Sequence, residues 1–73
     1  MLQTTKIDCI VFDKNTSDRF KYNKPIYTKL DSMYGYLSVS GMVVYFFWFN
    51  HDSNNVCCDD VSDRFTVKYK MSL

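Results

Sequence analysis

The chain has 73 residues, a formal net charge of +1 and an aromatic content of 18%. A chain of this length forms one small domain over residues 1–73, and such a core supports a stability of only about 3–5 kcal/mol. The near-neutral charge gives no global attraction for nucleic acid or for an anionic membrane. Ala and Glu, which favour helices, are absent, and Tyr, Phe, Val and Thr are plentiful, so the composition favours strands.

The first predicted elements form an N-terminal hairpin. Residues 6–12 alternate between an apolar face and a second face that Ile10 and Phe12 make partly apolar, which predicts a strand. Residues 13–17 are short and polar, as is typical of a turn. Residues 18–22 follow as a second strand, so the two segments together predict a hairpin.

Two structures are open for residues 23–35. Pro25 suits the first turn of a helix, Ile26 and Leu30 begin a run of apolar residues at helical spacing, and Gly35 suits a C-terminal cap. The rival interpretation is a strand over residues 26–30 and a turn over residues 31–35, because Tyr and Thr are weak helix formers. We prefer the short helix.

The second half of the chain predicts two more strands. Residues 36–49 read as one extended segment whose last eight residues, from Met42 to Phe49, are all apolar, as in a strand that is covered on both faces. Residues 50–63 form a polar connection, and residues 64–73 alternate cleanly as a final strand. We therefore predict an α+β fold with an antiparallel sheet of about four strands and one short helix, with an all-β five-stranded barrel as the alternative.

Residues with catalytic or metal-binding chemistry are present but poorly arranged. His51, Cys57 and Cys58 lie near three Asp residues, yet no Cys-x-x-Cys or His-x-x-x-His spacing occurs. Adjacent cysteines on a strand point to opposite faces and do not share one ion. The acids beside Cys58 also disfavour a reactive thiolate. We therefore expect no enzyme activity, no metal site, no cofactor and no small-molecule substrate.

The preferred functional hypothesis is a protein-binding module. Residues 42–49 place four side chains on each face of a strand, so one face packs in the core and the other is available to a partner. Residues 50–63 carry four Asp and no Lys or Arg, which suits a basic surface on a partner. The expected partner is a host protein or a second copy of the chain. The predicted contact residues are Trp48, Phe46, Tyr45, Asp52, Asp59, Asp60 and Asp63.

The alternative hypothesis is single-stranded nucleic-acid binding. Cations occur on the predicted outer faces of the second and last strands, and they would form one patch if those strands were neighbours. Tyr22, Tyr27 or Tyr36 would then supply a stacking ring. The residues of this patch are Arg19, Lys21, Arg64, Lys68 and Lys70. The small net charge weighs against this hypothesis.

The order of the predicted elements over residues 6–49 gives a resemblance to a known family. Pro25-Ile26-Tyr27 lies between the predicted hairpin and the predicted helix, and this order over residues 6–49 is similar to that of small phage inhibitors of bacterial RNA polymerase. The resemblance implies a phage or viral inhibitor of a host protein.

The N-terminus has no basic start or apolar stretch, and the three cysteines are an odd number, so we expect a cytoplasmic protein, in the host cytoplasm if viral, without a membrane partner.

Overall fold

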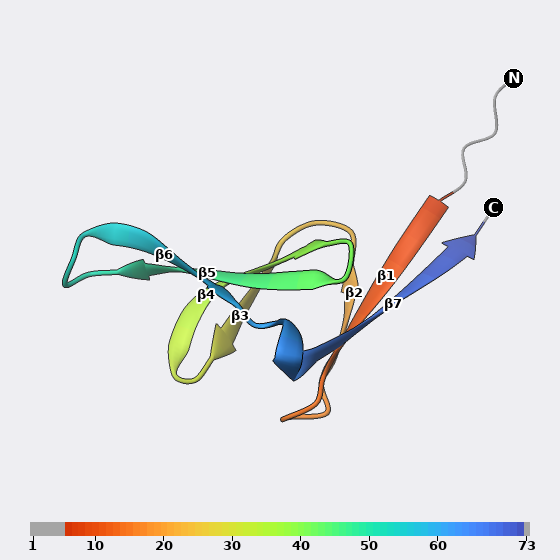
Figure 1. Cartoon of the computed structure of the whole chain (residues 1–73), viewed down its shortest axis with the longest axis horizontal. Coiled ribbons are helices and arrows are strands. Elements are labelled where there is room, and N and C mark those ends of the chain that lie inside the picture. The colour runs from red at the N-terminus through yellow and green to blue at the C-terminus, as the bar shows by residue number, and fades with distance from the viewer. Residues whose placement is uncertain (1–5, 73) are drawn as a thin grey trace, which may run out of the picture.

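The computed structural model describes the backbone of residues 6–72 and the side chains of residues 9–69 (Figure 1). The described residues form strands and a single 3-10 helix, η1, at Ser62–Arg64. None of their helices is long and apolar enough to cross a membrane. The strands are β1 (Lys6–Asp13), β2 (Arg19–Tyr22), β3 (Ile26–Leu30), β4 (Met33–Ser40), β5 (Val43–Asn50), β6 (Asn55–Asp60) and β7 (Phe65–Ser72).

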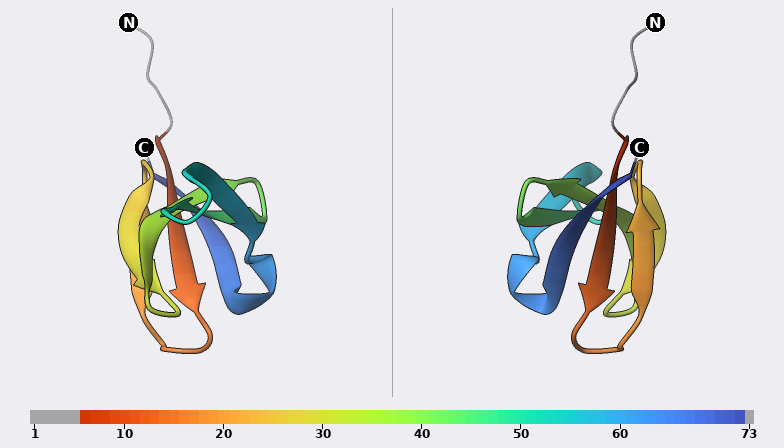
Figure 2. Two further views of the ribbon diagram at one scale, coloured as in Figure 1. Left: turned by 90° about the vertical axis from the view of Figure 1, so that its left-hand side faces the viewer. Right: turned by 90° about the vertical axis from the view of Figure 1, so that its right-hand side faces the viewer.

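The strands form two antiparallel sheets. One has the order β2-β1-β7 and the other has the order β3-β4-β5-β6. The chain passes from the first sheet to the second between β2 and β3, and it returns through η1 to β7, which pairs with β1 over its full length. The right-hand view of Figure 2 shows β1 between β2 and β7. The N-terminal and C-terminal strands are therefore neighbours, so both ends of the chain contribute to one sheet.

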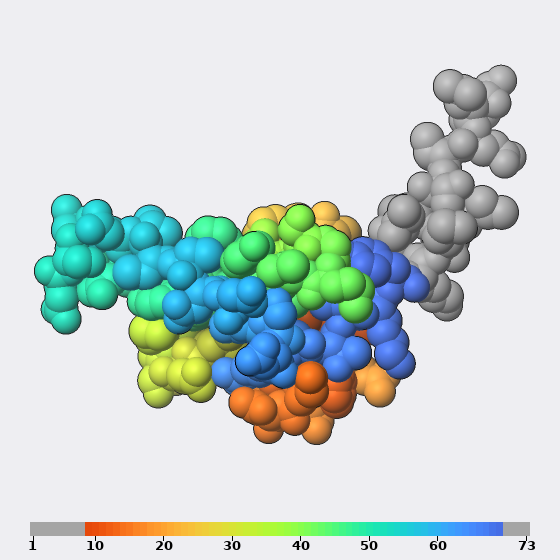
Figure 3. Space-filling view, in the orientation of Figure 1, coloured from red at the N-terminus to blue at the C-terminus, as the bar shows by residue number. Residues whose placement is uncertain are grey.

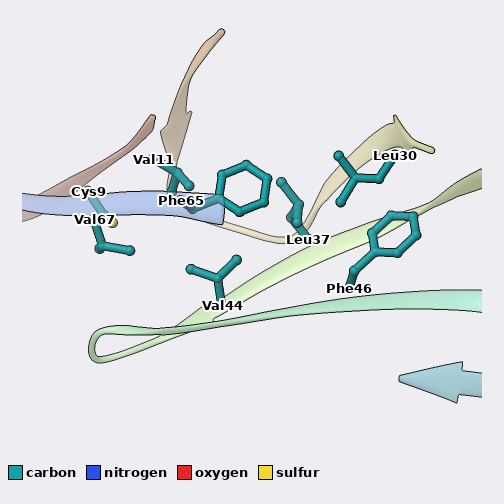
Figure 4. Packing of buried hydrophobic residues seen from close by; sticks show 8 residues of the cluster. All are labelled: Cys9, Val11, Leu30, Leu37, Val44, Phe46, Phe65 and Val67. Carbon is teal, nitrogen blue, oxygen red and sulfur yellow. The ribbon is translucent and has the colours of Figure 1, made fainter. Parts of the chain in front are cut away.

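The core lies between the two sheets. Alternate residues of each strand point inward because successive side chains of a strand lie on opposite faces. Figure 4 shows the inward side chains of both sheets directed toward one another. The buried apolar residues are Cys9, Val11, Leu30, Leu37, Val44, Phe46, Phe65 and Val67. Phe20, Tyr22, Ile26, Val39, Trp48 and Val61 pack around them and are only partly buried.

The short helix predicted within residues 23–35 is wrong, because β3 and β4 occupy this part of the chain. Asp31 and Ser32 join the two strands with φ angles of 48° and 71°, which is the backbone of a type I′ hairpin turn. Ile26, Leu30 and Leu37 all lie on the inner face, but they come from two strands. Their helix-like spacing therefore results from two alternating strands joined by a two-residue turn.

The single strand predicted over residues 36–49 is also wrong. Ser40 pairs with Val43, and Gly41 stands at the first position of the turn between them with a φ of 61°. Glycine at this position is typical of a two-residue hairpin turn, which separates β4 from β5. The chain therefore reverses direction where the continuous apolar run begins, and it forms two antiparallel strands instead of one.

The polar connection predicted over residues 50–63 contains β6. Asn50 Oδ1 accepts hydrogen bonds from the amides of Asp52 (2.9 Å) and Ser53 (3.4 Å), and Asn54 has a φ of 59°. These features close a four-residue turn, after which residues 55–60 pair with β5. Both predicted fold classes are thus wrong, since the described chain has two open sheets, no α-helix and no closed barrel.

Candidate functional site

Five aromatic side chains share the outer face of the four-stranded sheet. They occupy alternate positions in three adjacent strands, so they all point away from the core. Their exposed fractions range from 37% for Phe47 to 60% for Tyr27 and Tyr34. We call this surface the aromatic face, and its residues are Tyr27, Tyr34, Tyr36, Phe47 and Phe49. Such a cluster is unusual on a solvent-facing sheet and marks a candidate interaction surface.

The register of the sheet brings these rings together. Tyr27 pairs with Tyr36, and Tyr36 pairs in turn with Phe47, which gives a row across three strands. The Tyr27 and Tyr36 ring centroids are 5.2 Å apart, and those of Tyr27 and Tyr34 are 5.8 Å apart and nearly parallel. The rings line a shallow groove of roughly 390 Å³ that also reaches Val56 of β6. Ring pairs at these separations attract one another, so they stabilise the pairing of neighbouring strands.

The opposite side of the same strands explains why these rings point outward. Phe46 is 2% exposed and its ring stacks on Trp48 at 5.8 Å. The Phe46 ring lies over Gly35, where an added Cβ would come within 2.8 Å of its Cζ atom. Gly35 thus makes room for Phe46 on the inner face, and the intervening residue, Phe47, is left on the outer face.

This arrangement decides between the two faces that the sequence offered for residues 42–49. Phe46 belongs to the core and Trp48 is half-buried against it, so neither lies on the aromatic face. Tyr45 is half-buried on the outer side, with its ring 6.3 Å from that of Phe47. Phe47 and Phe49 are the residues of this block that present most ring surface to solvent.

The four predicted carboxylates are exposed but do not form one cluster. Asp52 lies in the turn between β5 and β6, and Asp63 lies in η1. Asp59 and Asp60 end β6 and point to opposite faces of it. The hydroxyl and amide of Ser62 donate hydrogen bonds to Asp60 Oδ1, and these bonds lower the pKa of Asp60. The four acids are therefore spread along the β6 side of the sheet, with Asp52 at the turn end of β6 and the other three at or beyond its opposite end.

The predicted basic patch is only partly assembled. Arg19 and Lys21 are on β2 and Lys68 is on β7, so β1 separates them. Between them lie the half-buried side chains of Ile10 and Phe12, and the Arg19 guanidinium carbon is 5.6 Å from the Phe12 ring centroid. Lys70 lies on β7, but its side chain is outside the described residues. This outer face belongs to the three-stranded sheet, not to the sheet that carries the aromatic face.

Arg64 has a structural position. Its Nε is 3.2 Å from both carboxylate oxygens of Asp13, and its NH1 is 3.2 Å from Asp31 Oδ1. Burial alone would raise the pKa of Asp13, but hydrogen bonds from Arg64, the Asn15 amide and Thr16 outweigh it, so the pKa is lowered. The same pairing raises the pKa of Arg64. Arg64 therefore ties the first hairpin to η1 and to the β3–β4 turn.

The thiols and the histidine show no catalytic arrangement. Burial raises the pKa of the Cys9 thiol, and a hydrogen bond with Tyr69 opposes this effect only in part. Cys57 and Cys58 point to opposite faces of β6, and His51 packs edge-on against Phe49 at 4.8 Å. Over the side chains of residues 9–69, no three His, Cys, Asp or Glu residues are grouped as metal ligands.

The sequence indicated Tyr27 and Tyr36 only as stacking rings beside the basic patch and did not indicate Tyr34, because a helix was preferred over part of this segment. With the rival strand interpretation, Tyr34 and Tyr36 fall on one face by alternation, and this signal was available. Their pairing with Tyr27 and Phe47 depends on the register of three strands, which the sequence does not specify.

Comparison of the chain with protein-family models, with curated proteins and with solved structures gives no match. The chemistry of the candidate site is therefore defined by the described side chains: five exposed rings on one face of a sheet, with three phenol hydroxyls among them. Such a surface can bury apolar area and donate or accept a few hydrogen bonds. These are the properties of a recognition surface.

Proposed function

We propose that the protein is a non-enzymatic binding module that holds a partner protein against its aromatic face. The observation that carries this proposal is the grouping of five exposed rings on one face of the four-stranded sheet. Each buried aromatic side chain removes roughly 150–250 Å² from water, so a few rings provide much of the apolar area of an interface. Exposing several neighbouring rings to water is unfavourable, so their grouping on one face indicates a surface that binds a partner.

The three tyrosines suit binding to a protein surface. A tyrosine has few rotatable bonds and combines an apolar ring with a polar hydroxyl, so it contributes large contact area at a small entropy cost. Lys29 adds a cation at the β3 border, with its Nζ 5.5 Å from the Tyr34 ring centroid. Aromatic anchors surrounded by polar groups are typical of the most important contacts at protein interfaces.

The structure favours a protein partner over single-stranded nucleic acid. A nucleic-acid platform needs stacking rings and phosphate-binding cations on one surface. Here the five rings of the aromatic face belong to the four-stranded sheet with Lys29 beside them, whereas Arg19, Lys21 and Lys68 belong to the other sheet, where Tyr69 is also exposed. Arg64 is engaged with Asp13 and Asp31. The resemblance to phage inhibitors included a helix within residues 23–35, and β3 and β4 take its place. The proposal therefore keeps a binding role and names no target.

Affinity capture with matched variants tests the proposal. Tagged wild-type protein, the aromatic-face variant Tyr36→Ser with Phe49→Ser, and the opposite-face control Lys68→Ser are compared in the same extract, with folding checked by circular dichroism. We expect a stoichiometric protein to bind the wild type and Lys68→Ser, and to be lost from the aromatic-face variant. Equal capture by all three proteins, or capture by none, contradicts the proposal.

Two further measurements test whether the partner is instead a nucleic acid or a second copy of the chain. Binding of unstructured oligonucleotides at low salt, lost on Lys68→Ser and falling steeply as salt rises, would favour the nucleic-acid alternative. A mass that doubles with concentration, and that returns to the monomer value in the aromatic-face variant, would show that the partner is a second copy of the chain.

A further inference from the structure

The four edge strands of the two sheets are protected unequally. Natural sheets block their edges with charged residues, especially Lys, or with Pro, because an exposed edge pairs with other strands. Arg19 and Lys21 lie on β2, Lys68 and Lys70 on β7, and Lys29 on β3. The fourth edge, β6, has the sequence Asn-Val-Cys-Cys-Asp-Asp and contains no Lys, Arg or Pro.

The free side of β6 presents unpaired backbone groups. Among residues 6–72, β5 is the only strand that pairs with β6. Val61 donates its amide to the Val44 carbonyl (2.8 Å) just beyond the end of β6. Because the direction alternates along an antiparallel ladder, the N–H and C=O groups of Val56, Cys58 and Asp60 point away from β5. These three residues therefore form a ready template for another strand.

The position of β6 leaves this template accessible. The turn end of the β5–β6 hairpin extends beyond the rest of the described chain, at the left of Figures 1 and 3. All residues of β6 except Cys57 are exposed. A strand added here would also continue the aromatic face, because Val56 pairs with Phe49 and Cys58 pairs with Phe47.

The charge around β6 selects the kind of strand that would fit. Residues 50–63 contain four Asp and no Lys or Arg. Asp59 and Asp60 end the strand, and the hydrogen bonds from Ser62 lower the pKa of Asp60. Complementary charge speeds encounter and rejects partners of like charge. In a partner segment that alternates apolar residues with Lys or Arg, the apolar side would continue the aromatic face and the basic side would share a face with Asp59.

We infer that β6 accepts an extended, positively charged segment of a partner protein as a fifth strand of the four-stranded sheet. This inference rests on the proposed binding function and names the chemistry of the partner. Backbone hydrogen bonds to the β6 edge provide affinity, and alternate side chains of the added strand provide specificity. The outward apolar row formed by Phe49 and Val56 receives one set of those side chains.

A random library of displayed peptides of about ten residues, the upper length of an ordinary strand, tests the inference. Wild-type protein should enrich Pro-free peptides that alternate apolar residues with Lys or Arg. Cys58→Pro removes an outward N–H without removing a bond to β5, and Cys58→Ser is its matched control because it keeps that N–H. We expect an enriched peptide to bind Cys58→Ser like the wild type and Cys58→Pro at least about tenfold more weakly, a loss of about 1.4 kcal/mol.

A second measurement leaves the protein unchanged, in case Cys58→Pro does not fold. Alternate amides of an extended peptide lie on one of its two edges, so N-methylation along the edge that pairs with β6 should abolish binding, and N-methylation along the other edge should not. With the unmodified peptide bound, the backbone amide hydrogens of Val56, Cys58 and Asp60 should exchange more slowly with solvent. Enrichment of acidic or Pro-rich peptides, no enrichment, or equal binding after N-methylation of either edge overturns the inference. Self-association that Cys58→Pro abolishes overturns it in favour of a second copy.

Failure of this inference is distinguishable from failure of the proposed function. If the captured partner protein still binds Cys58→Pro but not the aromatic-face variant, strand addition is refuted and the binding role of the aromatic face stands. If the partner binds the aromatic-face variant like the wild type, the proposed function itself is refuted.

Discussion

Replacing Arg64 with Met tests the bond network that joins the first hairpin to η1. Asp13 is 2% exposed, and Arg64 places Nε and NH2 3.2 Å from its carboxylate oxygens. Removing the guanidinium leaves a buried carboxylate whose remaining contacts include the Asn15 amide at 2.8 Å. Breaking a buried ion pair from one side costs about 3–5 kcal/mol, and we take the low end, about 3 kcal/mol, because Arg64 itself is near the surface.

A loss of about 3 kcal/mol is most of the stability expected for a domain of this size. It raises the unfolding equilibrium constant by about 160-fold. Urea denaturation followed by the fluorescence of Trp48, which stacks on the buried Phe46, measures the change. Asp31→Asn is the matched control, because it removes the second carboxylate that Arg64 contacts. The Asp31 side chain is 81% exposed, so this change should cost less than about 1 kcal/mol.

A double variant completes the test. Adding Asp13→Asn to Arg64→Met removes the uncompensated charge, so it should recover part of the lost stability. Equal losses for Arg64→Met and Asp31→Asn, or no recovery in the double variant, would refute the structural position given to Arg64.

Three other predictions concern the core, pH and the aromatic face. Gly35→Ala should destabilise by about 1–3 kcal/mol, because its Cβ meets the Phe47 carbonyl oxygen and the Phe46 ring; an unchanged urea midpoint would contradict this packing. The folded-state pKa of Asp13 is lowered, so its contribution is complete at neutral pH and is lost as the pH falls from about 4 through the lowered value. Acid titration of the unfolding free energy checks this, and an equally steep loss in Arg64→Met would oppose it. Phe49→Ser should change stability by less than about 1 kcal/mol, since Phe49 is 45% exposed, yet abolish capture of the partner; a large stability loss would place Phe49 in the core instead.

The strands at the two ends of the chain were predictable because local alternation was sufficient. Residues 6–12 and 64–73 alternate, and the turn at residues 13–17 is marked by short polar residues. That β7 pairs with β1 was not predictable, since the contact joins the two ends of the chain and no local pattern specifies it.

The middle of the chain was harder because its turns are only two residues long. Asp31-Ser32 and Gly41-Met42 each reverse the chain without a polar stretch that would separate the strands. Alternation offered two outer faces for residues 42–49, and the choice depended on the small space at Gly35, which draws Phe46 inward. The aromatic face follows from that choice and from strand register, so the sequence pointed to residues 42–49 but not to which of their side chains are exposed.

The most direct test of the binding role is a footprint of the captured partner protein on the chain, measured by NMR chemical-shift changes of backbone amides and aromatic rings. We predict that the largest changes fall on the outer face of β3, β4 and β5, at the rings of Tyr27, Tyr34, Tyr36, Phe47 and Phe49. Changes confined to β1, β2 and β7, with these five rings unaffected, would contradict the central claim that the protein acts through this face.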